Sequence, residues 1–358
     1  DVHEDTIKDP AATGSIKMDF GFRSAGLRWR YDGDNLRCNT FIGYLYTYQK
    51  MYLFEDFRFD LIDHRTTLFH ASKYRIGKHD LSAGVELQVE RMPIDMTAPQ
   101  LDEIDPDLTT APRIEVKDTA RLENYSVFVQ DSYSITDALT ARFGIRAEYP
   151  DFGDYQPIAM PRSAVVYQAT PRDALSLSAG IYAKRPEAYT LFKGFGNPKL
   201  GYEKANHYGL AWFRDFAPYG NLSIEPYYKT KYHLAMEDAE HQYKDNGCGE
   251  VFGVDISYKI RRKNWNMSLS YAFQRAKRQV YSDDDEMYHF EGDIPHTAQW
   301  GINYQLDSGW SMGFLAKYST GSAYTPITGT YLYTDIDGTT RVRPIYGDPY
   351  SQRKQNFF

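Results

Sequence analysis

The sequence predicts an all-β protein, an antiparallel transmembrane β-barrel of an outer membrane, and two observations lead to that prediction. Strand-length runs alternate apolar and polar residues, and these runs are joined in turn by short polar turns and by longer loops. Because successive side chains of a strand point to opposite sides, each run builds one apolar and one polar face. A strand with two such faces fits between lipid and a wet lumen.

The alternation predicts which side chains face lipid. In residues 138 to 149, Phe143 and Ile145 alternate with Arg142 and Arg146, and the run 80 to 92 has charged groups such as Glu86 on its second face. The residues expected to face lipid are Phe143, Ile145, Leu177, Ile181, Met267, Leu269 and Trp300, and those expected to face the lumen are Arg142, Arg146, Ser178, Glu86 and Asn303.

About fourteen strands are predicted between residues 14 and 320, because turn-forming residues separate runs with period-two alternation. A change of parity in the first run predicts a bulge near Gly26. We interpret 321–358 as a loop and truncated end, and 1–358 as a single barrel region. The predicted strands are 14–31, 36–49, 65–76, 80–92, 121–135, 138–149, 160–169, 174–184, 205–216, 220–232, 249–260, 265–279, 297–306 and 310–320.

Loop lengths predict the orientation in the membrane. The segments 93–120, 185–204 and 281–295 are long, whereas connections such as 170–173 and 307–309 are tight turns. In bacterial outer-membrane barrels the long loops face outside and the short turns face the periplasm.

Composition agrees with a barrel and excludes other classes. The 31 Tyr and 20 Phe bring aromatic residues to 16%, as interfacial girdles require. No run of ~20 apolar residues could span a bilayer as a helix. The net charge of -7 argues against a nucleic-acid partner, because phosphate binding needs clustered cations.

Three segments in order resemble the barrels of TonB-dependent outer-membrane transporters. The first runs from Tyr182 through Arg185-Pro186 to Leu210. The second is the glycine-rich approach 246–256, where Asp255 replaces the family's usual Glu, and the third is 295–326. The residues that carry the first and third motifs are Asn197, Pro198, Leu200, Glu203, Tyr324, Thr325 and Pro326.

The resemblance implies a partial barrel, since family members have about 22 strands. It implies a plug domain, which we expect to be absent from this chain, and a TonB-type energising complex that acts through that plug. The expected location is the bacterial cell outer membrane, with lipid as a partner. The expected function is import of a scarce nutrient, such as a siderophore-iron chelate, cobalamin or a glycan; the alternative is a passive porin-like diffusion channel.

No catalytic, metal or cofactor site is predicted, because the nine His are scattered and no nucleophile or phosphate-loop motif occurs. We expect that the protein is not an enzyme. The acidic segment 283–286 with His289 is either a solvated loop or a hard-cation site. Ligand binding is expected at the extracellular mouth, although girdle and loop packing would also explain the same residues: Arg185, Tyr189, Phe192, Lys193 and Tyr202.

Overall fold

The structure is a computed structural model that describes residues 2–3, 15–53, 57–99, 113–150, 156–193, 196–237, 243–279, 286–334 and 340–358. The described residues are almost entirely antiparallel strands, with one short 3-10 helix, η1 (Ala188–Leu191). No helix in these ranges is long and apolar enough to cross a membrane, an observation that does not concern strands.

The strands follow the predicted runs and mostly extend beyond them. Their bounds are β1 Val2–His3, β2 Ser15–Asp32, β3 Leu36–Leu53, β4 Phe57–Ile76, β5 His79–Pro99, β6 Arg113–Ser134, β7 Leu139–Pro150, β8 Ile158–Thr170, β9 Asp173–Lys184, β10 Glu203–Asp215, β11 Asn221–Glu237, β12 Tyr243–Arg261, β13 Trp265–Arg278, β14 Tyr288–His289, β15 His296–Gln305, β16 Ser311–Ser319, β17 Ala323–Tyr324, β18 Ile327–Thr334, β19 Thr340–Tyr346 and β20 Gln352–Arg353.

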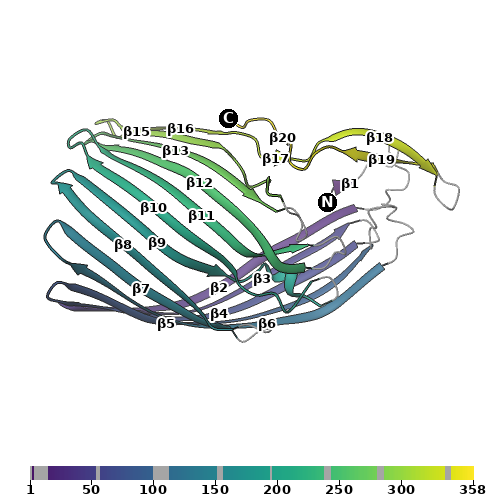
Figure 1. The fold of residues 1–358 in the computed structure, drawn as a ribbon, viewed down its shortest axis with the longest axis horizontal. Helices are drawn as coiled ribbons and strands as arrows, with labels where there is room; N and C mark the ends of the chain where they lie inside the picture. The colour runs from purple at the N-terminus through teal and green to yellow at the C-terminus, as the bar shows by residue number, and fades with distance from the viewer. Residues whose placement is uncertain are drawn as a thin grey trace. The chain divides into compact units, whose positions relative to one another are not determined.

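Each strand pairs with its neighbour in the chain. The order in the main sheet is β1 to β13, then β15 and β16, with β14 paired to β13; β17–β20 and β18–β19 form two separate pairs. Figure 1 shows the same order as a gradual change of colour from strand to strand. This arrangement confirms the all-β antiparallel prediction, because hairpin connections make consecutive strands antiparallel.

The chain divides into two compact units, which we describe one at a time. The first unit contains residues 1–131, 144–159 and 185–201, and the second contains 132–143, 160–184 and 202–358. The division crosses β6, β7 and β8, so it does not fall at a linker. We predicted that residues 1–358 form a single barrel region, and this stays a prediction.

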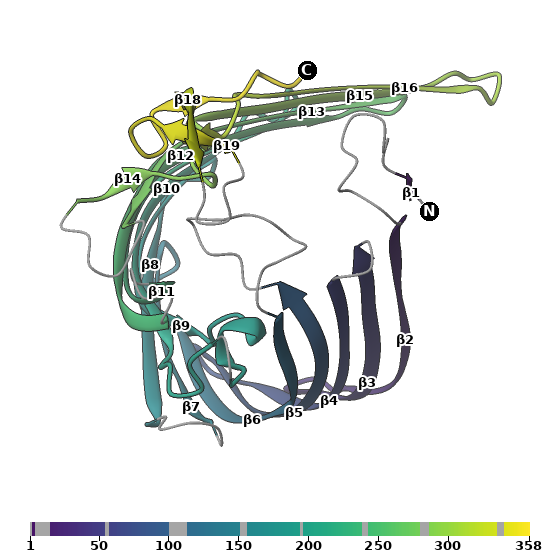
Figure 2. The ribbon, with the colours of Figure 1, turned by 90° about the vertical axis from the view of Figure 1, so that its right-hand side faces the viewer.

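In the first unit, β2 to β5 stand side by side, as Figure 2 shows, and share one exposed apolar face. Leu27, Ile42, Leu68 and Leu87 lie directly opposite one another across the four strands. Leu27 is 71% exposed and Ile42 is 49% exposed. An apolar row of this kind is stable only against lipid or another apolar surface.

The predicted bulge near Gly26 is wrong. The β2–β3 ladder keeps one register from Ile16↔Leu53 to Asp32↔Arg37. Gly26 lies opposite Gly43, and a Cβ atom on either glycine would meet the ring of Phe41 at 2.9 Å or less. The glycines therefore make room for an aromatic ring on the polar face, and the change of parity needs no extra residue.

The long loop expected at 93–120 is shorter, because β5 continues to Pro99 and β6 begins at Arg113. The β4–β5 ladder has no partners at Met92 and Pro93 and resumes with Leu61↔Ile94 in the same register. Proline lacks an N–H, so it removes a ladder hydrogen bond without ending the strand. Residues 100–112 of the expected loop lie outside the described ranges.

In the second unit the same division into two faces recurs. Val165, Leu177 and Leu210 form an exposed apolar row across β8, β9 and β10. Leu269 and Trp300 are opposite each other on β13 and β15. Five of the residues expected to face lipid are exposed, namely Phe143, Ile145, Leu177, Leu269 and Trp300, whereas Ile181 and Met267 are half-buried. That this face meets lipid stays a prediction.

The segment 321–358, expected to be a loop, instead contains strands. Residues of β18 pair with β19 from Ile327↔Tyr346 to Thr334↔Thr340. Tyr331, Leu332 and Val342 are aromatic or branched residues that fit a pleated surface. The prediction missed them because no long alternating run precedes them.

The apolar face can be tested by placing a charge on it. Leu177 is 63% exposed, and its neighbour Ser178 lies on the opposite face. We expect Leu177→Arg to lower the free energy of unfolding in lipid vesicles by about 2–4 kcal/mol, because arginine near the bilayer midplane is costly. Urea titrations of vesicle-folded protein measure this loss. The matched control, Ser178→Arg, should cost much less; equal losses would contradict the assignment of faces.

Candidate functional site

A buried carboxylate organises the polar face of the first unit. Glu90 of β5 is 1% exposed, and its two oxygens accept hydrogen bonds from Arg65 Nη2 at 2.8 Å and Arg185 Nη1 at 2.7 Å. Arg65 also donates to Asp63 at 3.1 Å. A buried carboxylate needs such partners, because an uncompensated charge in this position would be strongly destabilising.

A second ion-pair group lies on the same polar face. Arg146 of β7 donates to Glu86 at 2.8 Å and to Glu148 at 2.6 Å. Glu86 and Glu90 are four residues apart on β5 and therefore share a face. Arg146 and Glu86 thus lie on the charged side, opposite the exposed apolar row, as their alternation predicted.

In the segment 185–201 the described residues 185–193 and 196–201 are joined to one another by backbone hydrogen bonds. The Gly196 N–H donates to the Phe192 carbonyl at 2.9 Å, and the Asn197 N–H donates to the Thr190 carbonyl at 2.7 Å. A Cβ atom at Gly196 would lie 2.4 Å from the Thr190 oxygen, so only glycine fits there. The Asn197 side chain accepts the Lys199 N–H at 2.9 Å. Figure 2 shows η1, within this segment, near β5.

The rest of this motif is also structural. Leu200 is 1% exposed, and Pro198 is half-buried. Glu203, which begins β10 in the second unit, pairs with Lys184 at 3.2 Å and accepts the Ala235 N–H at 3.3 Å. Within the second unit, Glu203 thus fixes the start of β10.

The five residues expected to bind ligand have different environments. Arg185 is held by Glu90, and Phe192 is 0% exposed. Tyr202 is 5% exposed and belongs to the second unit. Tyr189 is 51% exposed, and the Lys193 side chain is exposed while its N–H donates to Asp118 at 3.2 Å. Tyr189 and Lys193 are therefore the two side chains presented to solvent; ligand binding by the five stays a prediction.

The third motif joins two strands of the second unit. The Tyr324 hydroxyl donates to Gln352 of β20 at 2.9 Å, and Thr325 Oγ1 accepts the Tyr350 N–H at 3.1 Å. The Pro326 carbonyl accepts a backbone N–H at 2.8 Å. These bonds hold β17 beside β20.

The expected acidic loop is described only in part, because residues 280–285 lie outside the described ranges. His289 lies 3.0 Å from Asp293, a fully buried carboxylate that accepts the Ala276 N–H at 2.7 Å and also pairs with Arg353. No group of three metal-binding side chains occurs among the residues that the structure describes. Sequence reasoning missed this role of Asp293, because its partners come from distant parts of the chain.

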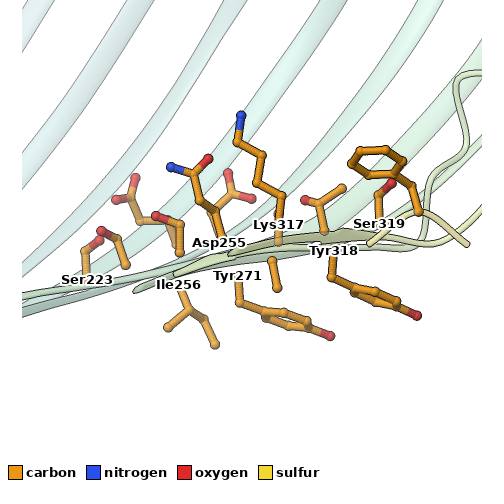
Figure 3. Close-up of a pocket in the computed structure, with 15 residues that line it drawn as sticks. Ser223, Asp255, Ile256, Tyr271, Lys317, Tyr318 and Ser319 are labelled. Atoms are coloured by element: carbon orange, nitrogen blue, oxygen red, sulfur yellow. The ribbon is translucent and has the colours of Figure 1, made fainter. Parts of the chain in front are cut away.

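An open cavity of about 490 Å³ lies on the polar face of the second unit. Figure 3 shows Ser223, Asp255 and Lys317 projecting to one side of the sheet, and Ile256 and Tyr271 to the other. The polar lining combines hydroxyl, carboxylate, amide and ammonium groups. Such a surface can form hydrogen bonds with a polar ligand or a polar polypeptide.

Strands with an exposed apolar face and a charged face, joined in chain order as antiparallel neighbours, define the class of outer-membrane β-barrel proteins. Within this class the chain belongs to the TonB dependent receptor-like, beta-barrel family, which it matches over residues 4–351. The resemblance and the bacterial outer-membrane location predicted from the sequence are thereby confirmed. This is a family of transporters and receptors, not of enzymes.

Solved structures show the same fold at low identity. The ferric-catecholate import receptor Fiu from E. coli is 13% identical, with a TM-score of 0.68 and coverage of 88% of this chain and 55% of Fiu. The siderophore receptor PiuA from Acinetobacter baumannii is 14% identical, with a TM-score of 0.65 and coverage of 92% and 57%. The copper transporter OprC is 16% identical, with a TM-score of 0.64 and coverage of 86% and 53%.

The chain therefore spans about half the length of these structures. At such identities the likeness concerns the fold alone. No protein with curated annotation matches the chain at a significant level.

The role of Glu90 can be tested by removing its charge. We expect Glu90→Gln to lower the free energy of unfolding by about 3–5 kcal/mol, because Arg185 loses its carboxylate partner in a buried site. It should also speed trypsin cleavage after Lys193, since the segment 185–201 is no longer held. Urea unfolding and timed proteolysis measure the two effects. The control is Glu86→Gln, where Arg146 keeps Glu148; a similar effect of both changes would contradict the argument.

Proposed function

We propose that this chain forms the wall of an outer-membrane importer for a scarce nutrient, such as a siderophore-iron chelate, cobalamin or a glycan. A TonB-type complex would supply energy through a plug domain that lies outside the strands described above. The ligand would first meet Tyr189 and Lys193 at the extracellular mouth. Arg185 would act there as a positioning residue, because its guanidinium is bound to Glu90.

The observation that carries the proposal is that residues 185–193 and 196–201 are held on the polar face of the first unit by hydrogen bonds. A passive channel needs an open lumen, whereas a selective importer needs side chains held in one place. Glu90 holds the segment at one end, and Asp118 accepts the Lys193 N–H within it. Preorganisation of this kind reduces the entropy that a ligand must overcome on binding.

Energised uptake distinguishes import from diffusion. Cells that express the protein under iron limitation should take up a supplied ferric siderophore with saturation, and a proton uncoupler should abolish the uptake. Linear uptake that survives the uncoupler would support a porin-like channel instead. In liposomes we expect the 358 residues by themselves to show no saturable, ligand-selective uptake. Such uptake would show that no plug is needed.

The proposed ligand contacts of Tyr189 and Lys193 can be tested by truncating both side chains. We expect the double change Tyr189→Ala and Lys193→Ala to weaken ligand binding by about 30- to 150-fold, because an exposed aromatic and a cation are each worth roughly 1–1.5 kcal/mol in such sites. Binding to whole cells measures the change. The control pair, Tyr219→Ala and Lys263→Ala, lies in two short turns. An equal loss of ligand affinity in the control variant would contradict the placement of Tyr189 and Lys193 at the extracellular mouth.

A further inference from the structure

Cations gather on the polar face of the second unit, away from the 185–201 segment. Arg162, Gly180, His207 and Lys229 lie opposite one another in one row across β8, β9, β10 and β11. In the next row on the same face, Lys231 lies two residues beyond Lys229. We call the cations Arg162, Lys229 and Lys231, together with the His207 ring in the same row, the cation cluster. His207 and Lys229 on adjacent strands, and Lys229 and Lys231 on one strand, are about 5–7 Å apart at their Cβ atoms, whereas Arg162 lies two strands, about 10 Å, from His207.

Aromatic rings support the cluster. The Arg162 guanidinium carbon lies 4.3 Å from the centre of the Tyr182 ring, and the same ring stacks on His207 at 4.2 Å. A Cβ atom at Gly180 would lie 3.0 Å from Arg162 Cγ, so the glycine leaves the space that the arginine occupies. The rings thus hold the cations in defined positions.

A similar support holds the lysine of the first row. Lys229 Nζ lies 4.6 Å from the centre of the Tyr227 ring. A Cβ atom at Gly253 would lie 2.6 Å from the Tyr227 hydroxyl, so this ring also rests on a glycine.

The cluster has little compensating charge. Within the part of the chain that the structure describes, no member of the cluster makes an ion pair with a carboxylate. Glu203 interacts with Lys231 but pairs with Lys184. Glu225 lies on the same face four residues before Lys229, ~13 Å along the strand. Arg278, opposite Gly249 near the edge of the cluster, pairs with Glu291 at 3.0 Å.

Like charges on neighbouring positions of one face are destabilising. Lys229 and Lys231 are alternate residues on one face of β11, and Arg162 lies in the same row as Lys229. The first unit shows the contrast, since its buried Glu90 compensates two arginines. Positive side chains that repel one another without a carboxylate partner are expected to bind an anion.

We propose that the cation cluster binds a small polyanion through its carboxylate, phosphate or similarly charged oxygens. The proposal rests on the proposed import function and narrows the ligand class, because a neutral glycan would gain nothing from these charges. Lys229 and Lys231 are the ligand-contacting cations. Arg162, packed on Tyr182 beside His207, completes the positive surface.

Calorimetry with citrate as the polyanion tests the site in the detergent-folded chain, with maltotriose as the neutral probe. Wild-type protein should bind citrate, and binding should weaken as salt is added. Lys229→Gln and Lys231→Gln should each weaken it about tenfold, as the loss of one charge-assisted hydrogen bond predicts. The control, Arg261→Gln with Lys263→Gln, removes two charges at a turn and should bind like wild type.

A second measurement, of melting temperature, distinguishes loss of the site from misfolding of a variant. Removing repulsion should raise the melting temperature of Lys229→Gln without citrate, and added citrate should raise that of wild-type protein more than that of the variant. Citrate that does not bind wild-type protein, or that binds the Lys229→Gln and Lys231→Gln variants as tightly, would overturn the site. Neither result tests energised uptake, which is measured separately in cells. The uptake assay alone therefore tests the import proposal.

Discussion

Backbone hydrogen bonding in lipid is the constraint on which this structure depends. In a bilayer core every N–H and C=O group must find a partner within the protein. Antiparallel strands in chain order satisfy these groups through neighbours that are one short connection away. Once the backbone is paired in this way, alternate side chains must face opposite media. The exposed row of Leu27, Ile42 and Leu68 and the buried Glu90 are two results of that single arrangement.

The two units use charge on the polar face in different ways. In the first unit Glu90 brings together Arg65 and Arg185, and each charge has a partner, so the network fixes a segment. In the second unit Lys229 lies on the Tyr227 ring and Lys231 lies opposite Gly249, and neither lysine forms an ion pair with a carboxylate within the described residues. A compensated network stabilises the fold, whereas an uncompensated one stores repulsion that a ligand can relieve. This difference separates positioning residues from candidate ligand contacts.

Sequence periodicity predicted the existence of the strands better than their ends. The alternation in β7 and β13 is strong enough to identify both strands and their faces. The ends of the strands were predicted less well, because proline and glycine occur inside strands as well as at their ends. Pro93 interrupts a ladder without ending β5, and Gly26 accommodates the Phe41 ring without a bulge. The hairpin of β18 and β19 lacked a long alternating run and was missed.

The sequence by itself determined the class of fold, the faces of the strands and the family, because these follow from local period and from motif order. Only the tertiary structure decided which candidate residues are available to a ligand. Phe192 and Arg185 have ligand-like chemistry, yet one is buried and the other is bound to Glu90, which lies 95 residues away in the chain. The cation cluster likewise comes from three strands. Its members meet because pairing register brings distant residues into one row, and composition alone cannot specify that register.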